Sequence, residues 1–145
     1  IRDRNGRRIA FDYGDVRIGV AISDASGLLA SPFGVLDATD KSSVLAEISA
    51  LTDEFSPIYF AVGMPKHLSG STSAKMESVQ DFISQLRTHF AIPIVEIDER
   101  LTTISAAQAL RTNGRNAKES KSLIDAAAAA TILEMALSME RLNEK

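Results

Sequence analysis

Two turn signals divide the first third of the chain into three consecutive strand patterns. The turns are Gly14-Asp15 and Ser26-Gly27, and apolar and β-branched residues fill the segments around them. The strands are predicted at Arg8–Tyr13, Arg17–Ser23 and Leu28–Leu36, the last interrupted by Pro32. Because consecutive strands joined by tight turns run in opposite directions, this part of the chain predicts a three-stranded antiparallel meander.

After the meander, helix and strand patterns alternate. Strands are predicted at Ile58–Val62 and Ile92–Asp98, and helices at Ser42–Phe55, from Ser71 or Ser73 to about His89, at Thr102–Leu110, and from Ser120 or Ser122 to about Leu142. The order β-β-β-α-β-α-β-α-α predicts an α/β fold, a five-stranded mixed sheet flanked by helices. The two later strands are apolar enough to be central, parallel and buried on both faces. We expect residues 1–145 to form a single domain.

Composition excludes several classes of protein. The chain has no cysteine, which excludes a disulfide scaffold, a cysteine-ligated zinc site and a thiol nucleophile. The net charge of −3 argues against a protein that coats DNA without specificity. The longest apolar run, Ala126–Ala130, is far shorter than the roughly 20 residues of a membrane span. No signal-peptide pattern is visible, so we expect a cytoplasmic protein.

Acidic residues lie at positions where core sequence surrounds them. Asp12 is inside an apolar strand, Asp98 and Glu99 end the fifth strand, and Asp125 precedes five alanines in the last helix. An unpaired carboxylate is costly in such places, and three brought together repel one another unless they share a cation. Oxygen ligands suit Mg²⁺ or Mn²⁺. The small residues Ala126–Ala130 would bring the last helix, with its acid, close to the strand ends.

Each acid also has a purely structural explanation. Asp12 could cap the turn at Gly14, and Asp98 or Glu99 could pair with Arg100. Asp125 could be a favourable acid at a helix N-terminus. The occurrence of all three at strand ends or a helix start of one fold favours a shared site.

Four segments of the chain have the order and spacing of a known family. They are FDYGDVRIGVAISD, which contains Asp12–Asp24, GMPKHLSG at Gly63–Gly70, DERLTT at Asp98–Thr103, and DAAAAATIL at Asp125–Leu133. Together they resemble the YqgF/RuvX family of Holliday-junction resolvases, which are also described as pre-16S rRNA nucleases. The resemblance covers essentially the whole chain and implies a ribonuclease-H-like fold.

The resemblance also implies a set of catalytic residues. Asp12, Glu99 and Asp125 match the acids that hold one or two Mg²⁺ or Mn²⁺ ions for phosphodiester hydrolysis in this superfamily. Asp98 is the substitute for Glu99, and the sequence alone leaves the choice open. The longer reach of Glu99 and the family pattern favour it, which leaves Asp98 to support Arg100 or a turn.

Basic and polar residues around these acids are candidates for nucleic-acid binding. Lys66 and Ser69 belong to the loop that follows a buried strand, a usual place for ligands in α/β sheets. His67 is more readily explained as an exposed loop residue. Four basic residues precede Asp125 and form a candidate phosphate-binding segment: Arg111, Arg115, Lys118 and Lys121.

Two arginines beside the acids have competing interpretations. Arg17 could bind a phosphate or orient Asp12, or it could form a salt bridge with Asp15 or Asp12. Arg100 could take a phosphate through two parallel hydrogen bonds. Thr102 or Thr103 is better explained as a helix N-cap.

Two further features carry less functional information. Arg2, Arg4, Arg7 and Arg8 form a basic cluster that we expect at a frayed terminus. Aromatic side chains that could stack on bases are scarce, and Tyr13 is the best placed.

These observations indicate a metal-dependent nuclease that acts on structured nucleic acid. The first candidate substrate is the 5′ end of pre-16S rRNA, with the ribosome as a partner, and the alternative is branched DNA. A junction resolvase cuts two symmetric strands and should be a homodimer, whereas an RNA-end nuclease can be a monomer. Two hypotheses of another class are a non-catalytic nucleic-acid-binding module and an actin-like ATPase-related fold. Wide separation of the three acids would favour the module, and ATP binding would favour the ATPase.

Overall fold

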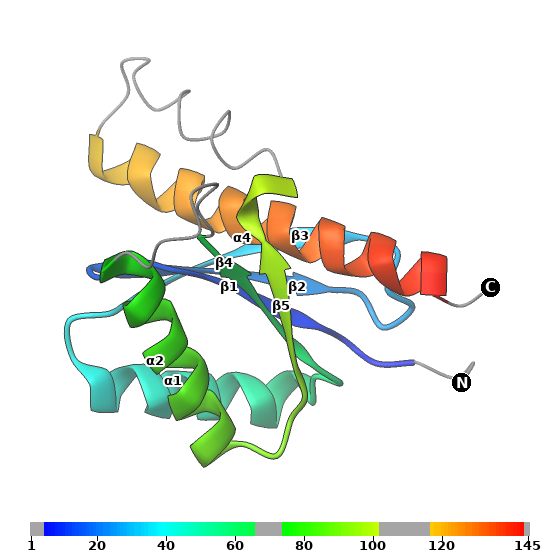
Figure 1. Cartoon of the computed structure of the whole chain (residues 1–145), viewed down its shortest axis with the longest axis horizontal. Helices are drawn as coiled ribbons and strands as arrows, with labels where there is room; N and C mark the ends of the chain where they lie inside the picture. Colours follow the sequence, from blue (N-terminus) through cyan, green and yellow to red (C-terminus); the bar gives the residue numbers. More distant parts are fainter. Residues whose placement is uncertain (1–4, 66–73, 102–116, 144–145) are drawn as a thin grey trace.

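The computed structural model describes residues 5–65, 74–101 and 117–143, with side chains described up to Arg100 and from Leu123 to Leu142. Helices cover both faces of a central sheet (Figure 1). The elements are β1 (Ile9–Tyr13), β2 (Arg17–Ser23), β3 (Ala30–Asp37), α1 (Lys41–Phe55), β4 (Phe60–Met64), α2 (Ala74–His89), β5 (Ile94–Asp98), a short 3-10 turn (Glu99–Leu101) and α4 (Ala117–Asn143). The helix predicted at Thr102–Leu110 lies outside the described residues.

The sheet has the mixed topology that the sequence predicts. Its strand order is β3-β2-β1-β4-β5. Strands β1, β2 and β3 pair antiparallel, which confirms the meander, and β4 runs parallel to both β1 and β5. Pro32 lies in the edge strand β3, where a proline interrupts the fewest ladder hydrogen bonds.

The expectation that both later strands are central is wrong for β5. All five residues of β4 are buried, whereas β5 is an edge strand that is only partly buried. Glu96 of β5 is exposed and lies 3.7 Å from Arg87 of α2. The apolar pattern of β5 therefore reflects the packing of its side chains. It does not indicate whether a strand pairs with it on one side or on both.

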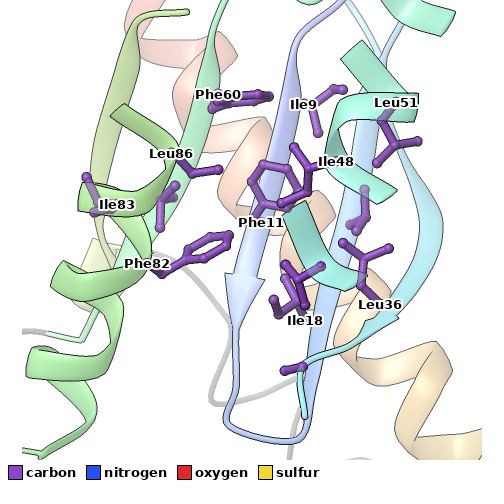
Figure 2. Packing of buried hydrophobic residues seen from close by; sticks show 14 of the residues in the cluster. Ile9, Phe11, Ile18, Leu36, Ile48, Leu51, Phe60, Phe82, Ile83 and Leu86 are labelled. Atoms are coloured by element: carbon purple, nitrogen blue, oxygen red, sulfur yellow. The ribbon is translucent and has the colours of Figure 1, made fainter. Parts of the chain in front are cut away.

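Large side chains fill the face of the sheet that α1 and α2 cover (Figure 2). Phe11 of β1 lies at the centre, with its ring 5.3 Å from that of Phe60 and 5.6 Å from that of Phe82. The Asp40 side chain caps α1 by accepting hydrogen bonds from the first turn. This face is a conventional aliphatic and aromatic core.

The opposite face, which α4 covers, is built mainly from small residues. The strands contribute Ala10, Ala21 and Ala61, and the helix contributes Ala128, Ala129, Ala130 and Ala136, with larger side chains toward its C-terminal half. Small residues let a helix backbone approach a sheet closely. In the described part of the chain, no helix combines the length and apolar character that crossing a lipid bilayer requires.

A buried ion pair fixes the C-terminal end of α4 to the start of β1. The Arg8 guanidinium donates to both carboxylate oxygens of Glu140, at 2.8 and 2.9 Å, and the Tyr59 hydroxyl donates to the same carboxylate at 2.6 Å. Arg8 is only 2% exposed. Arg7 donates to the Ser23 carbonyl at 3.2 Å. The expectation of a frayed terminus is therefore wrong for Arg7 and Arg8, because each binds a residue of another strand or helix. Arg2 and Arg4 of the same cluster lie outside the described residues.

Candidate active site

Asp12 lies in β1 on the face that α4 covers, and it is 8% exposed. Its partner across the antiparallel ladder is Gly19 of β2. On the other side, the parallel register pairs Phe11 with Val62, so the next position of β4, beside Asp12, is Gly63. Asp12 is thus flanked by a glycine on each neighbouring strand.

The first of these glycines makes room for the backbone of α4. A methyl group on Gly19 would overlap the main-chain carbonyl of Asp125 and lie 3.2 Å from the Ala126 nitrogen. The close approach that the five alanines predicted is therefore present, and it brings Asp125 to the strand beside Asp12. Because α4 begins at Ala117, Asp125 is in its third turn. Its interpretation as a helix N-terminal acid is wrong, since the dipole acts mainly within the first turn.

The second glycine makes room for the side chain of Glu99. A Cβ atom on Gly63 would lie 2.9 Å from Glu99 Oε2 and 2.6 Å from Ile132 Cδ1. Glu99 follows β5 in the 3-10 turn and extends back over β4 toward Asp12. Asp98 instead binds Arg100, whose Nη2 and Nε donate to it at 2.7 and 3.1 Å. The geometry therefore separates the two adjacent acids, with Glu99 on the Asp12 side.

The charges of Glu99 and Asp125 both act on Asp12. The pKa of Asp12 is raised from 3.8 to about 7, first by burial and then by the charges of Glu99 and Asp125, while Lys75 opposes the shift. The pKa of Glu99 is also raised, mainly by burial, with Lys75 lowering it and Asp98 raising it further. Asp12 and Glu99 are therefore acids whose ionised forms lack water and gain stability from a nearby cation.

Lys75 is a residue of this site that the sequence analysis missed. It is the second residue of α2 and is exposed, and its ammonium group acts on both Asp12 and Glu99. The signal in the sequence was its position, because α2 starts after the loop that leaves the buried strand β4. A cation in the first turn after such a loop lies at the carboxyl edge of the sheet.

Arg17 contacts the third acid directly. Its Nε donates to Asp125 Oδ2 at 2.7 Å, and the two side chains are 32% and 16% exposed. The alternative partners considered from the sequence, Asp12 and Asp15, are not the ones in this ion pair. The contact joins the first residue of β2 to the third turn of α4.

The donor set of the site suits a hard divalent cation. Asp12, Glu99 and Asp125 offer only carboxylate oxygens, the ligands that Mg²⁺ and Mn²⁺ prefer. Among the described side chains, no three acids or histidines stand close enough together to hold one ion between them as they are. Arg17 already binds one of the two carboxylate oxygens of Asp125, Oδ2.

The remaining predicted residues divide into two groups. Lys66, His67, Ser69, Arg111 and Arg115 lie outside the described residues, and Lys118 is in α4 ahead of its described side chains. Tyr13 packs against Phe82 with ring centroids 5.0 Å apart, on the α1 and α2 side of the sheet. Tyr13, the best placed of the scarce aromatic residues for stacking on bases, therefore lies on the face opposite Asp12, because strand alternation points the two side chains to opposite faces.

Comparison with protein families and curated proteins gives a consistent result. The family model RuvX, described as Holliday junction resolvase, matches residues 6–139. A Streptomyces coelicolor protein named "Putative pre-16S rRNA nuclease" is 40% identical over 143 residues, covering 98% of this chain and 86% of that protein. A Streptomyces avermitilis protein of the same name is 39% identical over 143 residues, covering 98% of this chain and 92% of that protein.

Solved structures show the same fold at low sequence identity. The structure titled "T. thermophilus RuvC in complex with Holliday junction substrate" matches with a TM-score of 0.57 and 13% identity. The match covers 94% of this chain and 96% of that one. The chain therefore has the ribonuclease-H-like fold of RuvC, as its resemblance to the YqgF/RuvX family implied.

Proposed function

The chain belongs to the RuvX family, and from this membership we propose that it is a metal-dependent nuclease whose Asp12, Glu99 and Asp125 hold one or two Mg²⁺ or Mn²⁺ ions. We take the described strands and helices to form one nuclease domain. The proposed substrate is the 5′ end of pre-16S rRNA, by analogy with the names of the curated relatives. A protein with this role would work in the cytoplasm, on or near the ribosome.

One observation carries the proposal. Asp12 is buried between two glycines, and the charges of both Glu99 and Asp125 raise its pKa. Acids from a strand, a turn after another strand and a helix are thus electrostatically coupled at one edge of the sheet. This arrangement favours catalysis over a non-catalytic binding module, because such a module does not require the three acids at one site.

The side chains have separate tasks in the proposed reaction. Bound Mg²⁺ or Mn²⁺ would offset the negative charge of the phosphodiester and acidify the attacking water. Asp12, rigid in β1 and poor in solvent, fixes the position of the site on the sheet. The carboxylate of Glu99 extends over Gly63 toward the site at Asp12. Lys75 adds a positive charge that stabilises the ionised acids and attracts a phosphate.

Binding of the nucleic-acid backbone is assigned to basic and polar residues around the acids. The proposed set is Arg17, Lys66, Ser69, Arg100, Arg111, Arg115 and Lys118. Because the whole chain carries a net charge of −3, affinity for a polyanion must come from such local groups and from the metal. Binding should therefore be weak at high salt and stronger with divalent cations.

A second candidate is resolution of branched DNA. The description of the family model and the fold shared with RuvC favour it. Symmetric cutting of a four-way junction requires two active sites and hence a homodimer. Sedimentation at micromolar concentration separates the two candidates in part, because a strict monomer counts against symmetric cutting of a junction.

The deciding experiment uses two labelled substrates, a pre-16S RNA fragment and a four-way DNA junction, each with Mn²⁺ or with EDTA. We expect the wild-type protein to cut the RNA with Mn²⁺ but not with EDTA. We expect Asp12→Asn to lower the cleavage rate with Mn²⁺ by at least about 100-fold. Asp53→Asn is the matched control, because Asp53 is an exposed acid of α1. Cutting of the junction alone selects the second candidate, and cutting of neither, with binding intact, favours the non-catalytic module.

A further inference from the structure

The contact between Arg17 and Asp125 is held from both sides by the fold. The main chain of Asp125 packs on Gly19, two residues after Arg17 in the same strand. Arg17 itself is fixed by the ladder between β2 and β3, where it pairs with Asp37. With both backbones fixed, the 2.7 Å hydrogen bond from Arg17 Nε to Asp125 Oδ2 depends on the side chains alone. It can break without moving a strand or a helix.

This contact uses Oδ2, one of the two oxygens that Asp125 could offer to a cation. A carboxylate held by a guanidinium has less electron density and less open space for a divalent ion. Asp125 is only 16% exposed, so solvent screens the contact only in part. Arg17 and a metal ion therefore compete for Asp125.

We propose that Arg17 is an exchange residue: it holds Asp125 in the metal-free protein, and it releases Asp125 to a divalent cation and turns to a phosphate of the nucleic acid. This inference rests on the proposed function, since it assumes that Asp125 is a metal ligand. In this exchange, Arg17 binds two oxyanions in succession, first the Asp125 carboxylate and then a phosphate.

Asp125 has a positively charged partner in both states of the exchange. Before metal binding, the positive charge beside Asp125 is Arg17, and afterwards it is the divalent ion. The released guanidinium remains beside the site because β2 holds its backbone, and it is 32% exposed, so a phosphate can reach it. A planar guanidinium binds a phosphate through two parallel hydrogen bonds, as it does a carboxylate.

The first measurement is Mn²⁺ affinity by titration calorimetry. Arg17→Ala removes the competitor, so we expect Mn²⁺ to bind about 3- to 10-fold more tightly than in the wild-type protein. Arg87→Ala is the matched control, because it also removes one positive charge, from an exposed pair between α2 and β5. We expect its Mn²⁺ affinity to stay within about twofold of the wild-type value. Circular dichroism checks that both variants are folded.

The second measurement separates exchange from a general effect of charge. Binding of the pre-16S RNA fragment and of the four-way junction is compared with Ca²⁺, another hard cation for oxygen ligands, and with EDTA. We expect Arg17→Ala to weaken binding with Ca²⁺ by about 3- to 10-fold and to change it little with EDTA, where Asp125 holds the arginine. A general loss of positive charge would weaken binding equally in both conditions.

The outcomes are distinct. Tighter Mn²⁺ binding together with a Ca²⁺-dependent loss of nucleic-acid binding supports the exchange. Unchanged or weaker Mn²⁺ binding by Arg17→Ala, or an equal loss of nucleic-acid binding with Ca²⁺ and EDTA, overturns it while leaving the proposed nuclease intact. Absence of Mn²⁺ binding in the wild-type protein and in Arg17→Ala overturns the metal-dependent function and the exchange together.

Discussion

The main-chain carbonyl of Asp125 lies directly against Gly19, in the space that any side chain at that position would fill. Because Gly19 is the ladder partner of Asp12, this one contact sets the height of α4 above the sheet at the candidate active site. The position of an acid is thus determined by backbone packing between two residues that are more than 100 positions apart in the sequence.

Replacement of Gly19 by alanine should displace α4. The added methyl group would meet the Asp125 carbonyl and the backbone beyond it, neither of which can move alone. We expect the free energy of unfolding to fall by about 2–3 kcal/mol, at the upper end of overpacking effects. Urea denaturation measures the change, and Gly34→Ala is the control because open space surrounds Gly34. A Gly19→Ala protein as stable as the control would contradict this packing.

Replacement of Gly63 by alanine should affect activity more than stability. The methyl group would meet Glu99 Oε2, which can move away, and Ile132 Cδ1, which can rotate. We expect nuclease activity to fall on the order of 10- to 100-fold, since a displacement of a reacting group by about 1 Å has effects of that size. Cleavage of the substrate that the wild-type protein cuts provides the readout. Gly34→Ala, again the control, should keep full activity.

Asp12 should make the metal-free protein less stable as pH rises from about 4 to 7. Its pKa is raised to about 7 in the folded protein and is close to 3.8 when unfolded, so the folded state binds the extra proton between these values. The contribution of Asp12 to the free energy of unfolding is fully present below about pH 4. It falls by about 1.4 kcal/mol per pH unit above that and is lost above about pH 7.

Asp12→Asn removes this dependence because the amide does not titrate. In EDTA at pH 8 we expect the variant to be more stable than the wild-type protein by on the order of 2–4 kcal/mol, with the difference shrinking toward pH 4. Denaturant titrations from pH 5 to 8 measure it. The exposed variant Asp53→Asn should follow the wild-type protein, and an Asp12→Asn curve parallel to both would show that burial does not raise the pKa of Asp12.

Metal binding should release a proton below pH 7. Asp12 must lose its proton to bind a cation, so the apparent Mn²⁺ affinity should rise by up to about tenfold per pH unit from pH 5 to 7 and then level off. Calorimetry in two buffers of different ionisation enthalpy counts the protons released. A pH-independent affinity would mean that Asp12 is already ionised or is not a ligand.

The ion pair between Arg8 and Glu140 should contribute far more to stability than the exposed pair between Arg87 and Glu96. Removal of the Arg8 guanidinium leaves a carboxylate that is only 13% exposed and accepts a hydrogen bond from Tyr59. We expect Arg8→Ala to lower the free energy of unfolding by about 3–5 kcal/mol, and Arg87→Ala by less than about 0.5 kcal/mol. Thermal and urea unfolding of the two variants tests the contrast, which equal effects would contradict.

Local signals in the sequence were sufficient for most of the fold. The turns at Gly14-Asp15 and Ser26-Gly27 specify the meander because each connects strands that are neighbours in the chain. Asp12 was identifiable as a candidate site residue because burial of an unpaired carboxylate inside an apolar strand is energetically costly. These features depend on residues close together in the sequence.

Long-range pairing could not be predicted in the same way. Arg17 lies 108 residues from Asp125, and Arg8 lies 132 residues from Glu140, so no spacing rule links either pair. The edge position of β5 likewise depends on the absence of a sixth strand in the described sheet, which the apolar pattern of β5 does not encode.

The contrast between the two faces of the sheet has a consequence for how this protein can accept substitutions. Leucine, isoleucine and phenylalanine on the α1 and α2 face can adopt other rotamers, so exchanges of similar volume can be absorbed there. Beneath α4 the space is tighter: a methyl group added at Gly19 meets the backbone of α4, and one added at Gly63 meets Glu99 of the candidate site. Sequence drift and stabilising redesign should therefore be directed to the α1 and α2 face, away from the alanine layer that carries the acids.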